Sequence, residues 1–138
     1  MLFRLLIVLA GICIVLSASL PWIELTGSAT GDGFASSVSN AGDINKDGIK
    51  DFLIGASNVG FNGRASRGVT YLLYGRPTLA DKSASTMTTD PTRGVRIFGA
   101  TAGEASGFSV SGLGDINGDG YGDFIIGAYL ADYSGRVD

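Results

Sequence analysis

The feature that most constrains the fold is an internal repeat with a period of 72 residues. Shifting the chain by this interval aligns residues 27–56 with residues 99–128 without a gap, and sixteen of the thirty aligned positions are identical. The matches include Val, Ile, Asp and Phe in register, so a general bias towards glycine does not explain them. A repeat of this length predicts similar supersecondary units that stack against one another.

Each unit is predicted to consist of short β-strands. Its apolar runs are four to six residues long and end at Gly, Pro, Asn or Asp, which is too short for helices and typical of buried strands. No helix is expected after the N-terminal segment. The predicted strands cover residues 22–25, 36–41, 52–56, 69–74 and 95–98. We therefore expect an all-β partial β-propeller of about two four-stranded blades, with a β-sandwich as the competing class.

The N-terminus has the pattern of a secretory signal peptide. A basic start precedes an apolar run at residues 5–16, and the small residues at 17–19 suit a signal peptidase. The apolar run is short for a membrane span, although an uncleaved signal anchor stays open as the alternative.

We expect a signal peptide at residues 1–19, a first blade region at 20–94 and a second blade at 95–138. Residues 135–138 match the start of the third strand of the first copy, so the second blade is predicted to be incomplete. A propeller closes with about 4–8 blades. The expectation is therefore a fragment of a longer protein, with assembly with other chains as the alternative.

Composition excludes several classes of function. The 138 residues contain no His and carry a formal charge of −3 with scattered Lys and Arg, which argues against His-based catalysis, His-ligated zinc and nucleic-acid binding. The single cysteine, Cys13, lies in the signal segment, so the mature chain would have no disulfide. No pair of carboxylates has a spacing that indicates a catalytic site, so we do not expect the chain to be an enzyme.

Two acidic loops are candidate calcium sites. Each carries oxygen-bearing side chains at loop positions 1, 3, 5 and 9 and a glycine at position 6, and position 7 can offer its backbone carbonyl. Six or seven oxygen ligands suit Ca²⁺ better than Mg²⁺ or Zn²⁺. The predicted ligands are Asp43, Asn45, Asp47, Ile49 and Asp51 in the first loop, and Asp115, Asn117, Asp119, Tyr121 and Asp123 in the second.

Two alternatives bear on these loops. An EF-hand needs Glu at position 12 and flanking helices, but position 12 is Ile54 or Ile126 in an apolar strand, so the EF-hand is rejected. Solvated turns without a metal remain the second alternative, because Asp, Asn and Gly are common turn residues. Lys46 and Lys50 are expected to offset the charge of the first loop, so tighter binding is predicted at the second.

The segments "GFSVSGLGDINGDGYGDFIIGA" (107–128) and residues 35–56 resemble the FG-GAP repeat, which builds the seven-bladed propeller of integrin alpha chains. In that family the acidic loops hold calcium, which the resemblance places on the loop residues named above. The signature pair departs from the family pattern, because it reads Phe34-Ala35 in one copy and Ser106-Gly107 in the other. The proline of the Gly-Ala-Pro element is also missing in both copies.

The resemblance implies a secreted or cell-surface segment that mediates protein binding or cell adhesion. Its expected partners are an extracellular protein or the remaining propeller blades. Contact with a membrane is expected only through the signal segment or a missing part of the parent protein. The alternative is the non-catalytic propeller of a secreted hydrolase, such as a glycosylphosphatidylinositol-specific phospholipase D.

Overall fold

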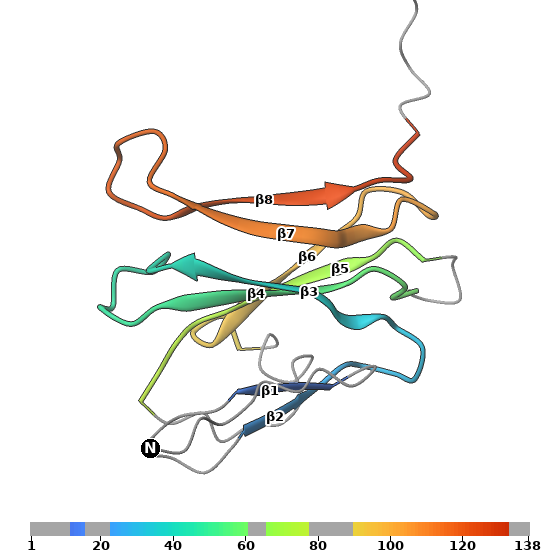
Figure 1. The fold of residues 1–138 in the computed structure, drawn as a ribbon, viewed down its shortest axis with the longest axis horizontal. Coiled ribbons are helices and arrows are strands. Elements are labelled where there is room, and N and C mark those ends of the chain that lie inside the picture. Colours follow the sequence, from blue (N-terminus) through green and yellow to red (C-terminus); the bar gives the residue numbers. More distant parts are fainter. Residues whose placement is uncertain (1–11, 16–22, 61–65, 78–89, 133–138) are drawn as a thin grey trace, which may run out of the picture.

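The described part of the protein is built entirely from strands, turns and bends. The computed structural model describes residues 12–15, 23–60, 66–77 and 90–132, which form eight strands in three antiparallel sheets (Figure 1). None of these residues belongs to a helix long and apolar enough to cross a membrane. The prediction of an all-β, partial propeller fold is confirmed, and the described sheets do not close into a ring.

The first copy of the repeat forms a four-stranded sheet, here called the first blade. Its strands pair in the sequential order β3-β4-β5-β6, so each strand hydrogen-bonds to the next along the chain. The strands are β3 (Phe34–Gly42), β4 (Asp51–Ala56), β5 (Val69–Leu73) and β6 (Gly94–Phe98). This sheet extends past residue 94, the boundary placed from the sequence, because β6 pairs with β5 from Leu73↔Gly94 to Val69↔Phe98.

The second copy forms a two-stranded sheet among the described residues, here called the second blade. It consists of β7 (Ser106–Gly114) and β8 (Asp123–Ala128). The pairing Ser106↔Ala128 repeats Phe34↔Ala56, and the irregularities at the two ends of the hairpin fall at matching positions in both blades. The two copies therefore fold into the same hairpin. The predicted third-strand start at residues 135–138 lies outside the described residues.

A short hairpin precedes the first blade. In it β1 (Ile12–Val15) pairs with β2 (Ile23–Thr26). The 72-residue shift aligns Ile23 of β2 with Val95 of β6, and each of these two strands pairs antiparallel with a neighbour. In this respect β2 resembles the outer strand of a blade. Apart from residues 12–15, the predicted signal segment lies outside the described residues, and its cleavage stays a prediction.

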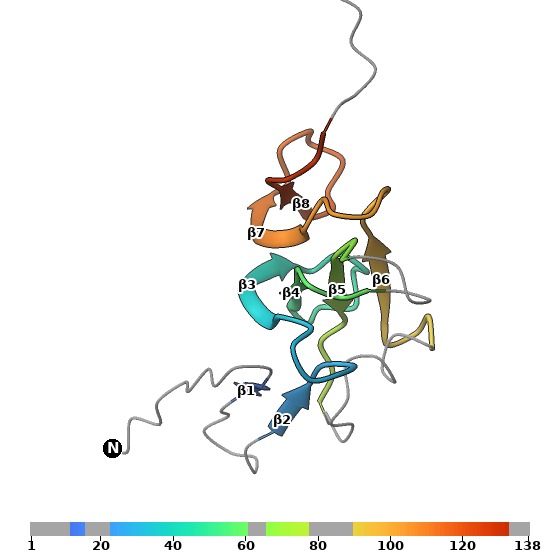
Figure 2. The same cartoon turned by 90° about the vertical axis from the view of Figure 1, so that its right-hand side faces the viewer.

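The sheets lie one above another, with the first blade between the β1–β2 hairpin and the second blade (Figure 2). Alternate side chains of β3 point to opposite faces, as the period of a strand requires. Ser37, Ser39 and Ala41 face the second blade, and we call this side the back of the blade. Ser36, Val38 and Asn40 lie on the other side, which we call the front.

Two apolar clusters hold this arrangement together. The cluster on the front of the first blade includes Leu25 of β2 together with Phe34, Ile54 and Tyr71, and the Phe34 and Tyr71 rings meet edge to face. The cluster on the back contains Ala41, Leu53 and Leu72, against which Val110 and Phe124 of the second blade pack. Burial of apolar surface between the sheets therefore stabilises this arrangement.

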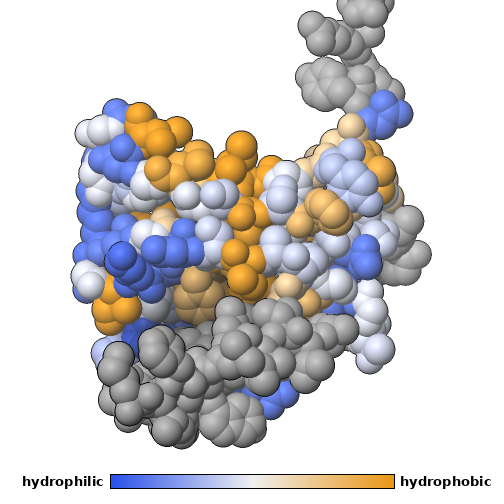
Figure 3. Space-filling model, viewed as in Figure 1, coloured by the Kyte–Doolittle hydropathy of each residue, from blue (hydrophilic) through white to orange (hydrophobic). Residues whose placement is uncertain are grey.

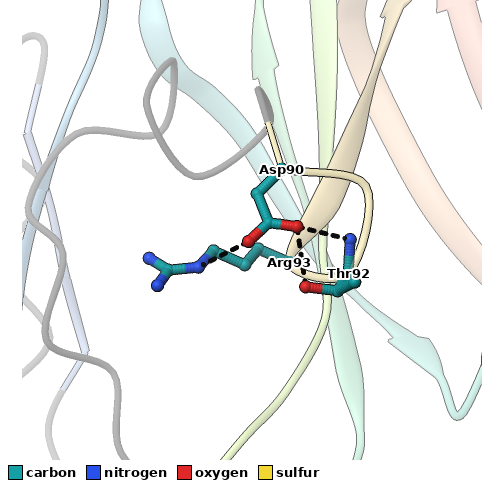
Figure 4. Close-up of polar contacts among 3 residues, drawn as sticks. All are labelled: Asp90, Thr92 and Arg93. Carbon is teal, nitrogen blue, oxygen red and sulfur yellow. Dashed lines mark hydrogen bonds and ion pairs between the residues drawn. The ribbon is translucent and has the colours of Figure 1, made fainter.

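Carboxylates fasten the turns that lead into the strands. Asp90 accepts hydrogen bonds from the backbone N–H and the hydroxyl of Thr92 at 2.9 and 2.7 Å and pairs with Arg93 at 3.1 Å (Figure 4). Asp32 accepts bonds from the N–H groups of Ser28 and Phe34 at 2.7 and 2.9 Å. These carboxylates hold the backbone in place.

Candidate metal centre

The two acidic loops lie at the same end of the stacked blades. One joins β3 to β4 and the other joins β7 to β8, and both project at the left of Figure 1. Most residues of the two loops are exposed to solvent. Because the hairpins share one register, each loop residue has its counterpart 72 positions away in the same structural place.

The first loop is closed by its own side chains. The two carboxylate oxygens of Asp43 accept hydrogen bonds from the backbone N–H groups of Asp47 and Gly48, at 3.0 and 2.8 Å. Asn45 accepts from the N–H of Asp47 at 3.0 Å, and its amide donates to the Asp47 carboxylate at 2.8 Å. The other Asp47 oxygen accepts from the N–H of Ile49 at 2.8 Å. Three of the predicted ligands are thus brought together.

The second loop repeats this network. Asp115 accepts from the N–H groups of Asp119 and Gly120 at 3.1 and 2.8 Å, and also from Gly118 at 2.7 Å. Asn117 and Asp119 are joined as Asn45 and Asp47 are, and Asp119 accepts from the N–H of Tyr121 at 2.8 Å. Asp and Asn side chains readily form hydrogen bonds to backbone groups a few residues away. The local sequence is therefore enough to specify the conformation of this loop.

The carboxylates at position 9 differ from the others. Asp51 is almost completely buried, with 1% of its surface exposed, and accepts from the N–H groups of Ile44 and Gly75 at 2.7 and 2.8 Å. It therefore ties the loop to the end of β5. Its counterpart Asp123 makes the first of these bonds, to Ile116 at 2.9 Å, and is only partly buried.

The donor chemistry of the loops fits a hard cation. All candidate ligand atoms are oxygens, and a carboxylate oxygen that accepts one hydrogen bond keeps a second lone pair, whereas Asp115 Oδ1 accepts two. Among the described residues, however, no three side chains of the Asp, Glu, Cys or His type gather as a ready-made metal centre. The physical reason is that the carboxylates are turned onto the N–H groups of their own loops.

The side chain of Lys46, a residue of the first loop, extends to the second loop. Its ammonium nitrogen is 3.4 Å from the centre of the Tyr121 ring and 3.5 Å from the backbone carbonyl oxygen of Asp119, both in the second loop. The expectation that Lys46 offsets the charge of the first loop is therefore wrong. Only the stacking of the two blades brings this side chain to the other loop.

Sequence reasoning also missed a second pair of structural carboxylates. Glu104 accepts hydrogen bonds from the N–H of Ala100 at 2.9 Å and from the hydroxyl of Thr101. These hydrogen bonds, that from the Thr101 side chain above all, lower the pKa of Glu104. Its counterpart 72 residues earlier is Asp32, which closes the equivalent turn. The repeat itself was the signal that could have found this pair.

Comparison with known families identifies the repeat. The FG-GAP repeat matches residues 34–73 and 106–138. The first match contains the first three strands of the first blade, and the second match begins with β7 and contains both strands of the second blade. These matches contain both acidic loops.

Curated proteins similar to this chain include several integrin alpha chains. Integrin alpha-5 of Xenopus laevis is 33% identical over 124 residues, which cover 86% of this chain and 11% of that protein. Integrin alpha-8 of Mus musculus is 35% identical over 106 residues, covering 76% and 9%. Integrin alpha-PS2 of Drosophila melanogaster is 34% identical over 101 residues, covering 72% and 7%. The chain spans about a tenth of the length of these relatives.

Proposed function

The chain belongs to the FG-GAP repeat family, and we propose that it is a calcium-binding segment of an integrin-like propeller that acts outside the cell by binding another protein. The observation that carries the calcium proposal is the duplicated loop. Two segments 72 residues apart keep oxygen side chains at the same four positions and fold them into the same hydrogen-bond network.

Calcium would act structurally in these loops. Asp43, Asn45, Asp47 and Asp51 would supply the side-chain oxygens of the first site, with the backbone carbonyl of Ile49. Asp115, Asn117, Asp119 and Asp123 would supply those of the second site, with the carbonyl of Tyr121. The cation would neutralise carboxylates that repel one another and would link ordering of the loops to folding.

A calorimetric titration tests this proposal. Calcium is added to the chelator-treated chain and to its Asp43→Ala and Asp115→Ala variants, and each variant is expected to lose one of two binding events. The melting temperature of the chain should also rise with calcium and fall again with chelator. Absence of both heat and a melting shift would contradict the proposal, and an equal response to magnesium would contradict its selectivity.

An extracellular location and a role in adhesion are proposed on two supports. The first is the predicted signal segment, and the second is the similarity to integrin alpha chains from several animals. We propose no catalytic role, because the carboxylates Asp90 and Glu104 serve to hold turns. Attachment of cells to a surface coated with the chain, with calcium and then with chelator, tests the adhesive role. Equal attachment to an uncoated surface would contradict it.

A further inference from the structure

The back of the second blade exposes an apolar surface. Leu113, Ile116 and Ile125 are 44, 68 and 57% exposed, and apolar surface is visible along the upper edge of the molecule over β7 and β8 (Figure 3). Their counterparts in the first blade are Ala41, Ile44 and Leu53, which pack under the second blade. The exposed back of the second blade thus corresponds to the back of the first blade, which the second blade covers.

The polar groups of that contact are repeated as well. Between the blades, the hydroxyl of Ser37 donates to the carbonyl oxygen of Gly107 at 2.9 Å, and the hydroxyl oxygen of Ser39 accepts from the N–H of Gly112 at 3.0 Å. The second blade has serines at both counterpart positions, 109 and 111. Its back therefore offers the apolar and the hydrogen-bonding groups that hold two blades together.

Two glycines on the front of the second blade make the existing contact possible. A Cβ atom on Gly112 would lie 1.9 Å from the carbonyl oxygen of Asn40, and one on Gly122 would lie 2.7 Å from that of Ala41. Both obstacles are backbone atoms in the blade beneath, so they cannot rotate away. Neither glycine has a positive φ, which means that close approach, and not backbone conformation, requires them.

The front of the first blade matches this surface in its apolar groups but not in its glycines. Val38, 41% exposed, and the partly buried Phe52 are the counterparts of Val110 and Phe124. At the positions of the two glycines, however, the first blade has the exposed residues Asn40 and Lys50. A blade back cannot approach this front as closely as the first blade approaches the second.

We propose that Asn40 and Lys50 determine which blade faces can pack together. Their side chains keep the front of the first blade in one copy from packing against the back of the second blade in another copy. They thereby prevent head-to-tail assembly of this chain. The back of the second blade is left for a blade of the same repeat that carries glycine at both positions. This proposal rests on the family assignment and on packing, and it does not depend on calcium.

The β1–β2 hairpin is compatible with such packing. Since β2 is the counterpart of β6 under the 72-residue shift, it lies where the outer strand of an incoming blade would lie. The contact between copies would be heterologous, so it would not close and would build chains of increasing length.

The test is a gain of assembly. The full chain and its Asn40→Gly/Lys50→Gly variant are compared by sedimentation over a range of concentrations, in chelator. The variant is expected to show an average mass that exceeds that of the unchanged chain and rises with concentration. Adding Ile125→Ser should return the mass to that of the unchanged chain. Equal masses for the unchanged chain and the double variant would overturn the proposal.

A matched control distinguishes this contact from non-specific hydrophobic association. Leu130 is 54% exposed, close to the 57% of Ile125. It lines a pocket together with Ser57 and Gly103, however, and does not belong to the back of the second blade. Adding Leu130→Ser to the double variant should leave its assembly unchanged. If this change abolishes assembly as fully as Ile125→Ser does, the back of the second blade is not the contact and the proposal is wrong.

A reciprocal variant keeps the test decisive if the double variant does not fold. Gly112→Asn/Gly122→Lys places the residues of the first blade on the front of the second. The melting temperature is expected to fall by about 5–10 °C, because the two blades can no longer approach each other. An unchanged melting temperature would overturn the requirement for glycine.

Discussion

The ammonium nitrogen of Lys46 lies 3.4 Å from the centre of the Tyr121 ring, so a residue of the first acidic loop contacts the second. Lys46 has a positive φ of 60°, and its counterpart in the second loop is Gly118, with a φ of 78°. A lysine thus occupies a conformation that favours glycine, and its side chain gains a contact between blades in return.

This pair predicts measurable coupling between the two loops. A double-mutant cycle with Lys46→Met and Tyr121→Leu, followed by urea denaturation in chelator, should give a coupling energy of about 0.5–1 kcal/mol, the usual size for an exposed cation–π contact. The cycle with Lys50→Met in place of Lys46→Met is the control. Coupling no larger than in this control would contradict the contact.

The two carboxylates at position 9 should differ in their importance for stability. Asp51→Asn replaces one of two acceptor oxygens that face backbone N–H groups in a buried site, so we expect a loss of about 2–3 kcal/mol in the free energy of unfolding. Asp123→Asn should cost about 1 kcal/mol, because its site is more exposed. Urea denaturation in chelator measures both. A larger loss for Asp123→Asn would be inconsistent with this picture.

A matched pair of glycines tests the packing between blades. A Cβ on Gly55 would lie 1.9 Å from the backbone oxygen of Gly107 in the second blade, so Gly55→Ala is expected to cost about 1–3 kcal/mol. At the counterpart Gly127, the nearest atom is the hydroxyl oxygen of Ser109, which can rotate away, and the next nearest atoms are 3.6 Å distant. Gly127→Ala should therefore cost less. Equal losses in thermal or urea unfolding would refute this difference.

The stability of the protein should fall in acid, partly through Glu104. Hydrogen bonds from Thr101 and Ala100 lower its pKa in the folded protein below the ordinary value of 4.5. The folded state therefore favours the ionised form. This contribution is complete above the unfolded-state value and is lost as the pH falls through the lower folded-state pKa.

Melting temperatures measured from neutral pH down to about pH 2 check this expectation, since the contribution is lost below the ordinary pKa of Glu. The Glu104→Gln variant should lose less stability than the unchanged chain below pH 4.5. Thr101→Val, which removes the principal hydrogen bond, should reduce the acid dependence in the same direction. Parallel curves for all three proteins would exclude a role for Glu104.

The sequence by itself determined the repeated hairpin and its loop. The side chains at positions 1, 3 and 5 of each loop bond to backbone or side-chain groups only a few residues away, so the same residues at these positions form similar networks around Asp43 and Asp115. The apolar run that follows each loop likewise specified β4 and β8, because a short apolar run bounded by turn residues is typical of a strand.

Only the tertiary structure decided what these local units do to each other. The partner of Lys46 is 75 positions away at Tyr121, and the obstacle that requires glycine at position 112 is the carbonyl oxygen of Asn40. Such contacts depend on how closely two sheets approach, which is set by packing across the whole interface and not by any local pattern. For the same reason Leu53 and Ile125 hold equivalent places in the repeat, yet one is buried and the other is exposed, because only Leu53 has a blade packed over it.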